Sequence, residues 1–222
     1  MKREVIQTAD GSRTLFIPEM NEQYHSVNGA LTESEYVFLK QGYLHHTSPS
    51  PVVFEVGFGT GLNALLTALK AEEQKRKTRF ISIEKYPLSN PELENLEYDK
   101  LISEEAAVLF DKIHTAAWNE EIEISAYFSI YKIKADLKTF DFGGLPRFNI
   151  IYFDAFAPDK QPDLWSLQIF ETIHKSSATN AIFVTYSAKG VIRRQLESVG
   201  YKTERLPGPP GKRQMMRGVA IL

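Results

Sequence analysis

Three glycines spaced two residues apart are the first feature of this sequence that could serve a ligand. Gly57, Gly59 and Gly61 follow an apolar run and precede a helical pattern in VVFEVGFGTGLNALL, residues 52–66. Glycine has no Cβ atom, so the backbone can turn sharply here and approach a ligand closely. The spacing matches neither the P-loop nor the GxGxxG dinucleotide motif, because Leu62 stands where the last glycine is required. We therefore expect a ligand-binding loop of another kind.

Two acidic residues near these glycines indicate the charge of the ligand. Glu55 lies in the apolar run, and Glu84 ends a second apolar run, RFISIE (79–84). In α/β folds a carboxylate about 20 residues beyond the glycine loop accepts hydrogen bonds from ribose hydroxyls. Two acids also disfavour a polyphosphate, so a cationic nucleoside is expected, of which S-adenosylmethionine is the common one. The alternative is a tight strand-to-helix turn that binds nothing.

A second group of candidate residues lies in YFDAFAPDKQPDLW, residues 152–165. An apolar run ends at Asp154, and Phe156 follows in a loop that two prolines stiffen. A carboxylate can orient an amine and accept its proton, while an aromatic ring can stack on a base. We predict Asp154 and Phe156 as catalytic residues of an amine-binding site. The alternative is a structural loop whose aromatic ring packs in the core.

An alternation of strand and helix patterns would position both groups. Buried strands are predicted at 52–56, 79–84, 149–154 and 180–186, and helices at 62–70, 91–113, 163–175 and 189–199. Residues 122–135 suit a long strand or hairpin arm, and 201–206 with 215–222 a closing antiparallel pair. This order predicts a Rossmann-like α/β fold, a mostly parallel sheet with helices on both faces and a C-terminal antiparallel hairpin. Ligands of such sheets bind beyond the carboxyl ends of the strands.

Composition excludes several classes of site. The 222 residues include no cysteine, which rules out disulfides, thiolate zinc sites and a cysteine nucleophile. The one close histidine pair, His45–His46, lacks partner ligands at metal spacing, so no metal is expected. No apolar stretch has the length of a signal peptide or a membrane span, which favours a cytoplasmic protein with no membrane partner.

Charge is distributed unevenly along the chain. The formal net charge is −2, yet the segment from Lys189 to Arg217 holds eight basic residues against two glutamates. Such asymmetry permits one basic face that contacts nucleic acid. A solvated helix and tail is the alternative.

Several blocks in order resemble the methyltransferase domain of the bifunctional tRNA 5-methylaminomethyl-2-thiouridine biosynthesis protein family (MnmC) and its stand-alone relatives. The blocks are YHSVNGALTESEYVFL (24–39), FEVGFGTGLNALL (54–66), SIEKYPL (82–88), FDAFAPDKQPDLW (153–165), TYSAKGVIRRQLESVGY (185–201) and GPPGKRQMMRG (208–218). Two departures are Ala155, where the family commonly has glycine, and SATNA (177–181), where it commonly has a PGG turn.

The resemblance implies methyl transfer from S-adenosyl-L-methionine to the amine of 5-aminomethyl(-2-thio)uridine at the tRNA wobble position. It implies the cofactor-binding residues Glu55, Gly57, Phe58, Gly59, Thr60, Gly61, Asn63, Glu84, Lys85, Asp136 and Asp154. Among them Asp136 would lie near the adenine amino group, although a helix N-cap or turn is its alternative role. The implied substrate and tRNA contacts are Asn28, Glu33, Trp165, Arg193, Arg194, Lys212, Arg213 and Arg217.

Domain organisation follows from the same resemblance. Residues 1–50, with Asn28, Gly29 and Glu33, form an N-terminal extension that closes the site, and residues 51–222 form the methyltransferase domain. The family's FAD-dependent oxidase half has no counterpart here, so a separate enzyme would supply the amine. Two other readings remain open: a small-molecule methyltransferase or aminopropyltransferase of the same architecture, and a cofactor-binding module without catalysis.

Overall fold

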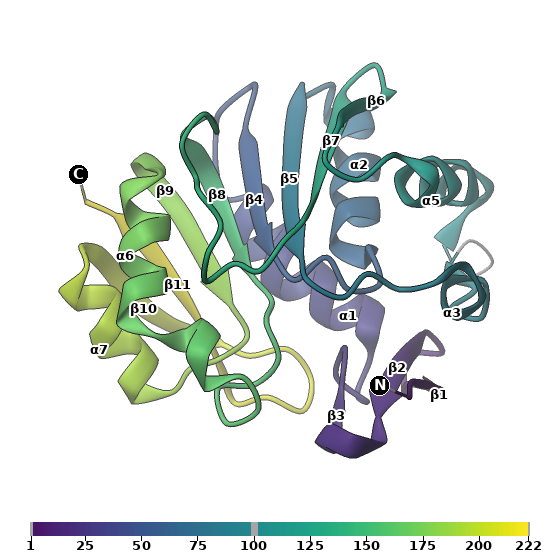
Figure 1. Ribbon diagram of the computed structural model, residues 1–222, viewed down its shortest axis with the longest axis horizontal. Coiled ribbons are helices and arrows are strands. Elements are labelled where there is room, and N and C mark those ends of the chain that lie inside the picture. Colours follow the sequence, from purple (N-terminus) through teal and green to yellow (C-terminus); the bar gives the residue numbers. More distant parts are fainter. Residues whose placement is uncertain (1, 99–101, 222) are drawn as a thin grey trace.

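The computed structural model describes residues 2–98 and 102–221, and a mixed eight-stranded sheet forms its centre (Figure 1). The strand order is β10-β11-β9-β8-β4-β5-β7-β6. The strands are β4 (Val52–Val56), β5 (Thr78–Glu84), β6 (Glu121–Ser125), β7 (Phe128–Lys134), β8 (Phe148–Phe153), β9 (Ser177–Thr185), β10 (Tyr201–Pro207) and β11 (Gln214–Ala220).

The middle of the sheet is parallel and its edges are antiparallel. Strand β4 pairs in parallel with β5 and β8, and these pair in parallel with β7 and β9. The antiparallel pairs are β6 with β7, β9 with β11, and β10 with β11. The predicted fold class and C-terminal hairpin are confirmed, and residues 122–135 belong to the β6–β7 hairpin.

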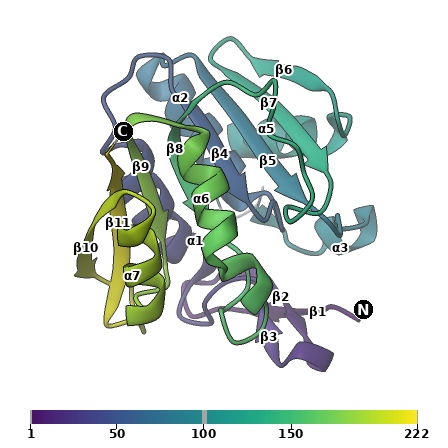
Figure 2. The ribbon, with the colours of Figure 1, turned by 60° about the vertical axis from the view of Figure 1, so that its left-hand side comes forward.

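Helices cover both faces of the sheet, as the apolar strands require. On one face lie α1 (Ala30–Ser34) with its π-helical continuation η2 (Glu35–Tyr43), α2 (Leu62–Gln74) and α5 (Glu104–Thr115). On the other lie α6 (Leu167–Lys175) and α7 (Gly190–Ser198), which Figure 2 shows side by side. Neighbouring strand residues alternate between the two cores: Val53 packs in the first and Phe54 in the second.

Two predicted helices differ from those observed. The pattern at 91–113 does not form one helix, because α3 (Asn90–Glu94) ends before Glu97, whose φ of +53° is incompatible with a helix. Part of that pattern, Leu101, lies outside the described residues. The pattern at 163–175 begins as the 3-10 turn η3 (Pro162–Trp165), and α6 follows.

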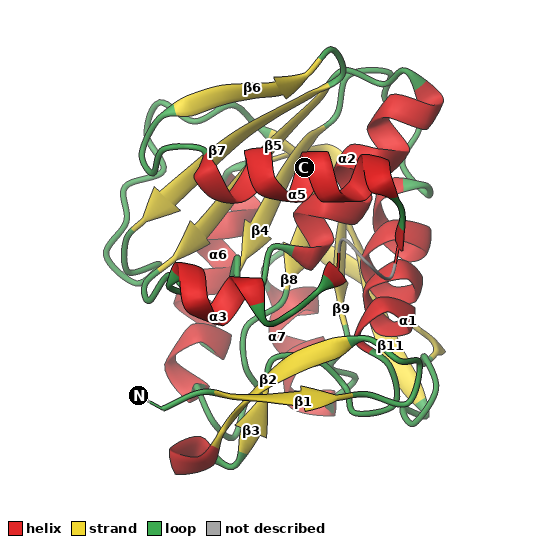
Figure 3. Ribbon diagram, turned by 90° about the vertical axis from the view of Figure 1, so that its right-hand side faces the viewer, coloured by secondary structure: helices red, strands yellow, loops and turns green. Residues whose placement is uncertain are grey.

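The N-terminal segment forms a small antiparallel sheet of its own. It comprises β1 (Glu4–Gln7), β2 (Arg13–Ile17) and β3 (Glu22–Gln23), with the 3-10 turn η1 (Pro18–Met20) between the last two. Figure 3 shows these strands beside the carboxyl ends of the central strands. Among the described residues, no helix combines the length and apolarity that crossing a bilayer requires.

Candidate active site

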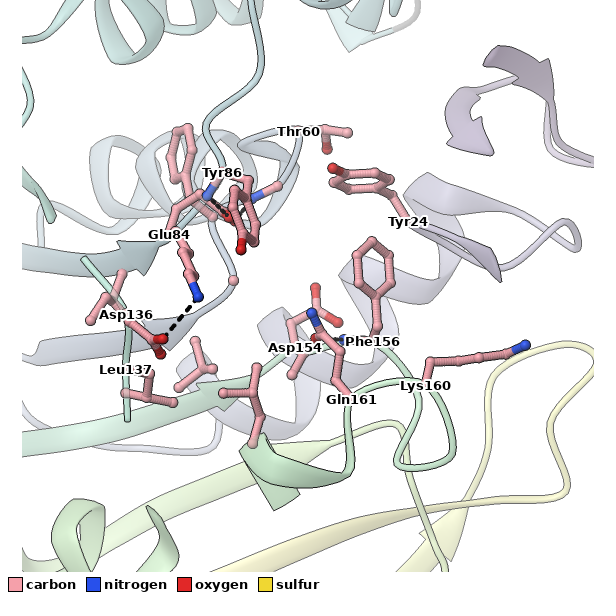
Figure 4. Close-up of a pocket in the computed structure, with 18 of the residues that line it drawn as sticks. Tyr24, Thr60, Glu84, Tyr86, Asp136, Leu137, Asp154, Phe156, Lys160 and Gln161 are labelled. Atoms are coloured by element: carbon pink, nitrogen blue, oxygen red, sulfur yellow. Dashed lines mark hydrogen bonds and ion pairs between the residues drawn. The ribbon is translucent and has the colours of Figure 1, made fainter. Parts of the chain in front are cut away.

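A cavity of about 380 Å³ opens where four parallel strands end. Its lining comes from the residues that follow β4, β5, β7 and β8, together with part of the N-terminal segment (Figure 4). Glu84, Asp136 and Asp154 therefore face one space although they are distant in sequence. This is the edge at which open α/β sheets bind ligands.

The backbone of the glycine loop lines this cavity at Gly57 and Gly59. Gly57 has φ +88°, and a Cβ atom there would lie 2.9 Å from the carbonyl oxygen of Asp154. Gly59 has φ +51°, and its Cβ atom would press on the ring of Tyr24 at 3.1 Å. Gly61 does not line the cavity; it lies behind, where a Cβ atom would come within 2.8 Å of His114.

The remaining loop residues contribute side chains to the wall. Phe58, Thr60 and Asn63 all line the cavity, as expected. His114 holds the loop from behind, since its Nε2 lies 3.1 Å from the carbonyl oxygen of Thr60. Burial lowers the pKa of His114 to about 4, so the ring is neutral at pH 7.

Glu84 ends β5 with its carboxylate fixed at the cavity. Its Oε1 accepts a hydrogen bond from the backbone N–H of Tyr86 at 2.8 Å, and its Oε2 accepts one from Gly59 at 3.3 Å. These donors hold the ionised group in place and leave further lone pairs facing the cavity. A ribose with two hydroxyl groups fits this arrangement.

Lys85 and Asp136 form an ion pair across the same end of the cavity. Lys85 Nζ lies 2.9 Å from Asp136 Oδ2, and Oδ1 accepts the backbone N–H of Lys138 at 3.0 Å. The hydrogen bond from Lys85 holds the pKa of Asp136 below its usual value. Apolar side chains from the strand ends form the adjoining wall, which suits a flat ring: Ile83, Ala135 and Leu137.

Asp154 lies at the centre of the cavity, directly after β8. Asn63 donates a hydrogen bond from Nδ2 to its Oδ2 at 2.9 Å. Burial raises the pKa of Asp154 to about 7, the nearby Glu33 carboxylate adds to the rise, and the charge of Lys212 opposes it. The carboxyl group is thus poised to hold or exchange a proton near neutral pH.

Glu55 does not reach the cavity, in contrast to the prediction. It is completely buried behind the glycine loop, where Ser82 Oγ donates to its Oε2 at 2.6 Å. Burial raises its pKa well above the usual value, so the group favours its neutral form. Glu55 therefore does not contact a ligand in the cavity directly, and its hydrogen bond links β4 to β5.

Phe156 lines the cavity, but the predicted contact of Trp165 with substrate is wrong. Phe156 packs edge-on against Tyr24, with ring centroids 5.0 Å apart. Trp165 is only 3% exposed and lies in the second core. Its Nε1 donates to the carbonyl oxygen of Phe156 at 2.8 Å, and Gln161 Oε1 accepts from the backbone N–H of Phe156 at 3.2 Å.

Sequence reasoning missed four cavity residues in the N-terminal segment: Arg3, Met20, Tyr24 and His25. Tyr24 and His25 both line the cavity, and burial raises the pKa of Tyr24 to about 12 and lowers that of His25 to about 4. They are the first two residues of the block at 24–39, but their pattern alone carries no chemical signal. Both are neutral hydrogen-bonding groups at pH 7.

Asn28 and Glu33 of that block face the C-terminal turn at 208–213 instead of lining the cavity. Glu33 is paired with Lys212, and Asn28 lies against Gly211, whose Cβ atom would overlap its side-chain amide. Lys212 is therefore not the free phosphate contact that was predicted, because its ammonium group is already paired with a carboxylate.

Several cations of the predicted basic face are already paired with carboxylates. Arg193 is paired with Glu197, and Arg217 with Glu204 and the side-chain oxygen of Gln41, so these two serve the surface structure. Arg194 and Arg213 are exposed, and neither has an ion pair within the described part of the chain. Those two remain available for an anion.

A family model described as S-adenosyl-L-methionine-dependent methyltransferase matches residues 91–221. The chain belongs to this family. The methyltransferase is 31% identical, over 92% of its length, to the bifunctional protein MnmC of Burkholderia vietnamiensis, but it spans only 33% of that relative. The bifunctional MnmC protein of Aeromonas salmonicida is 30% identical, with similar coverage. The resemblance to the methyltransferase part of MnmC is thereby confirmed.

Solved structures agree with this assignment. MNMC2 from Aquifex aeolicus superposes with a TM-score of 0.78 and 25% identity, covering 98% of the methyltransferase and 70% of that chain. Spermidine synthase from Thermotoga maritima shares the fold, with a TM-score of 0.54 at 14% identity.

The cavity of the methyltransferase fits S-adenosyl-L-methionine, the cofactor of the family. Gly57 and Gly59 line the cavity with bare backbone at positive φ, Glu84 presents a fixed carboxylate to a ribose, and Ile83 with Leu137 offers an apolar wall to a base. The acidic lining suits a sulfonium cation better than a pyrophosphate.

Proposed function

We propose that this methyltransferase methylates the primary amine of 5-aminomethyl(-2-thio)uridine at the wobble position of tRNA. The observation that carries the proposal is the position of Asp154, between the cofactor half of the cavity and the Phe156–Tyr24 aromatic pair. An amine acceptor needs a carboxylate there, and a nucleobase needs a flat wall. The name of the MnmC relatives supports the same substrate.

When bound, S-adenosyl-L-methionine supplies an electrophilic methyl group: a N–CH₃ bond forms, the S–CH₃ bond breaks to leave a thioether, and the nitrogen loses one proton. The chain supplies alignment and a place for that proton. Glu84 holds the ribose, and Asp154 accepts a hydrogen bond from the amine and then its proton, to which its raised pKa is matched. Phe156 and Tyr24 shield the amine from water, which favours its neutral form.

The N-terminal segment closes the site in this proposal. Lys160, in the loop after β8, donates to the carbonyl oxygen of Met20 at 2.7 Å, and Arg3 donates to the carbonyl oxygen of Tyr86 at 3.2 Å. These two contacts join the residue before β1 and the end of η1 to the loops that follow β5 and β8. A wobble base must be turned out of its stack to pass between them.

Cations near the mouth would bind the tRNA backbone. Arg194 and Arg205 converge on Gly190 at the start of α7, with guanidinium nitrogens 3.3 and 3.6 Å from the Cβ position there. Lys189 just before α7 pairs with Asp159 in the loop that carries Phe156, so this turn lies beside the site. Two like charges without carboxylate partners in the described structure favour an anion such as phosphate.

The amine substrate would come from a separate activity, because the cavity offers residues for methyl transfer and one nucleoside cofactor. A tRNA substrate places the proposed reaction in the cytoplasm. Any second activity that the bifunctional name of the relatives covers is not assigned to this chain, which spans a third of their length.

The test is transfer of labelled methyl groups to tRNA that lacks the terminal methyl group, followed by digestion to nucleosides. We expect the label in the modified wobble uridine, and none with Asp154→Asn. Label in polyamines or other small amines alone would favour the small-molecule alternative. Cofactor binding without transfer to any acceptor would favour a binding module.

A further inference from the structure

The turn at 208–213 is docked against the N-terminal segment by several contacts. Gly211, with φ +82°, leaves just enough room for the side chain of Asn28. Tyr36 donates a hydrogen bond to the carbonyl oxygen of Pro207 at 3.0 Å, and Lys212 is ion-paired with Glu33. The turn is therefore part of the wall behind the substrate side of the cavity.

Glu33 is an unusual carboxylate because its side chain is only 7% exposed. Its Oε2 accepts the backbone N–H of Ser26 at 2.7 Å, and Lys212 Nζ contacts Oε1. A buried charge needs such partners, since removing one of them leaves the other uncompensated. Separating the ion pair in the folded protein is therefore energetically costly.

Lys212 also links this pair to the catalytic loop. Its Nζ lies 3.8 Å from the ring centroid of Tyr186, over the aromatic face. Tyr186 in turn donates a hydrogen bond to the carbonyl oxygen of Ala155 at 2.8 Å, next to Asp154. One chain of contacts therefore runs from Glu33 through Lys212 and Tyr186 to the residue beside the catalytic carboxylate.

We propose that Glu33 and Lys212 are positioning residues for methyl transfer, and that their balanced pair sets the electrostatic field in which Asp154 meets the amine. Lys212 cancels the charge of Glu33, so that Asp154 carries the net negative charge of this side of the cavity. The inference deepens the proposed function and rests on it for the identity of the amine.

Other titratable groups lie around Asp154 and the Glu33–Lys212 pair, and burial favours the neutral form of each. Glu55 on β4, His25 after β3 and Tyr186 after β9 have pKa values shifted by burial toward their neutral forms. Glu33 on α1 raises and Lys212 lowers the pKa of Asp154. Removal of either member should therefore move this pKa, and in opposite directions.

The experiment measures the carboxyl pKa of Asp154 by carbon-13 NMR in protein labelled at aspartate, with Asp154→Asn to assign the signal. We expect Lys212→Met to raise the pKa by about half to one unit and Glu33→Gln to lower it by a similar amount. The double variant should return near wild type, and Lys212→Arg should stay there. Lys202→Gln, which removes an exposed cation from β10, is the control for net charge.

Activity gives the second readout. With a pKa near 7, a rise of one unit lowers the deprotonated fraction at pH 7 from about one half to one tenth, so kcat/KM should fall about fivefold in Lys212→Met and recover at pH 8.5. A merely structural role would lower activity equally at both values of pH. If Lys212→Met fails to fold, Glu33→Gln and the double variant still carry the comparison.

The two proposals fail separately because the NMR titration needs no tRNA. An Asp154 signal that titrates identically in all variants would overturn the role of the pair, whatever the substrate. Shifts of the expected sign without any label in the wobble uridine would leave the pair in place and overturn the substrate.

Discussion

The indole nitrogen of Trp165 holds the carbonyl oxygen of Phe156 at 2.8 Å, so a core residue fixes the backbone of an active-site aromatic. Phe156 has a second anchor in Gln161, whose Oε1 accepts its backbone N–H. The loop after β8 is therefore anchored on its core side, while the ring packs edge-on against Tyr24. Precise placement of such a ring matters because methyl transfer requires an aligned acceptor.

We expect Trp165→Phe to lower turnover by about 10-fold or more while cofactor affinity changes little. The phenyl ring fills most of the buried volume but cannot donate to Phe156, which leaves a carbonyl group without its partner. Steady-state kinetics with saturating cofactor, together with calorimetry of cofactor binding, measure the two quantities. A parallel loss of cofactor affinity would place Trp165 in support of the whole cavity instead.

Asp154→Asn should lower turnover by about 10²–10⁴-fold and leave cofactor binding broadly intact. The amide preserves the size of the group and its contact with Asn63, but it cannot accept the proton of the amine. Single-turnover methyl transfer measures the effect. Rates within a few-fold of wild type would show that another group or water accepts the proton.

The same variant should be more stable than wild type near pH 7.5. The pKa of Asp154 is about 7 in the folded state against its ordinary value of 3.8, so the unfolded state releases the proton first as pH rises. Stability is thus lost between about pH 4 and 7 in wild type and retained in the variant. We expect the difference in free energy of unfolding between the variant and wild type to grow by about 1–3 kcal/mol from pH 5 to pH 7.5. Water in the cavity screens the carboxylate and brings this difference toward the lower end of the range. Denaturant unfolding at both values of pH checks this, and a constant difference would contradict it.

Gly59→Ala should abolish most cofactor binding. The added methyl group meets the ring of Tyr24 at 3.1 Å in a backbone conformation of φ +51°, so the loop must move. Gly144→Ala is the matched control, because Gly144 has φ +90° but open space around it. We expect similar backbone strain in both proteins, of about 1 kcal/mol, and weakened cofactor binding in Gly59→Ala alone. Equal affinities by calorimetry would move the cofactor away from this glycine.

The double variant Arg194→Gln with Arg205→Gln should bind tRNA more weakly and with a shallower salt dependence. Each lost phosphate contact reduces the slope of log K against log salt by somewhat less than about one unit. The control removes two exposed lysines from the opposite edge of the sheet, Lys77→Gln with Lys175→Gln, which precede β5 and β9. Filter binding over a range of salt concentrations measures the tRNA affinity and its salt dependence for both double variants. Identical slopes in the two double variants would assign tRNA binding to another surface.

Local patterns in the sequence were enough to predict the strand ends and the glycine loop. Val52–Val56 matches β4, and Glu84 and Asp154 reach the cavity because parallel strands end at one edge. Partners distant in the chain could not be predicted in this way. Nothing near Lys212 in sequence indicates its pairing with Glu33, and nothing near Trp165 distinguishes a substrate wall from a support of Phe156.

Two polar residues, Glu55 and Arg217, were misassigned for the same reason: their partners are distant in the sequence. Glu55 looks like a ligand contact in sequence because it precedes the glycines, but its position in β4 points it beneath the loop, toward Ser82 on the neighbouring strand. Arg217 looks like a free cation until the register of β10 and β11 places Glu204 opposite it. Strand register, which depends on tertiary pairing, decided both outcomes.

The pairing of Glu33 with Lys212 joins residues 179 positions apart, and this separation governs the order in which the site can be assembled. During synthesis the glycine loop and β5 leave the ribosome long before the turn at 208–213 exists. A nascent chain can therefore form only part of its first core while Glu33 still lacks its cation. Closure of so long a loop is entropically slow. Because Lys212 is synthesised so late, the charge of Glu33 is balanced only when nearly the whole chain has folded.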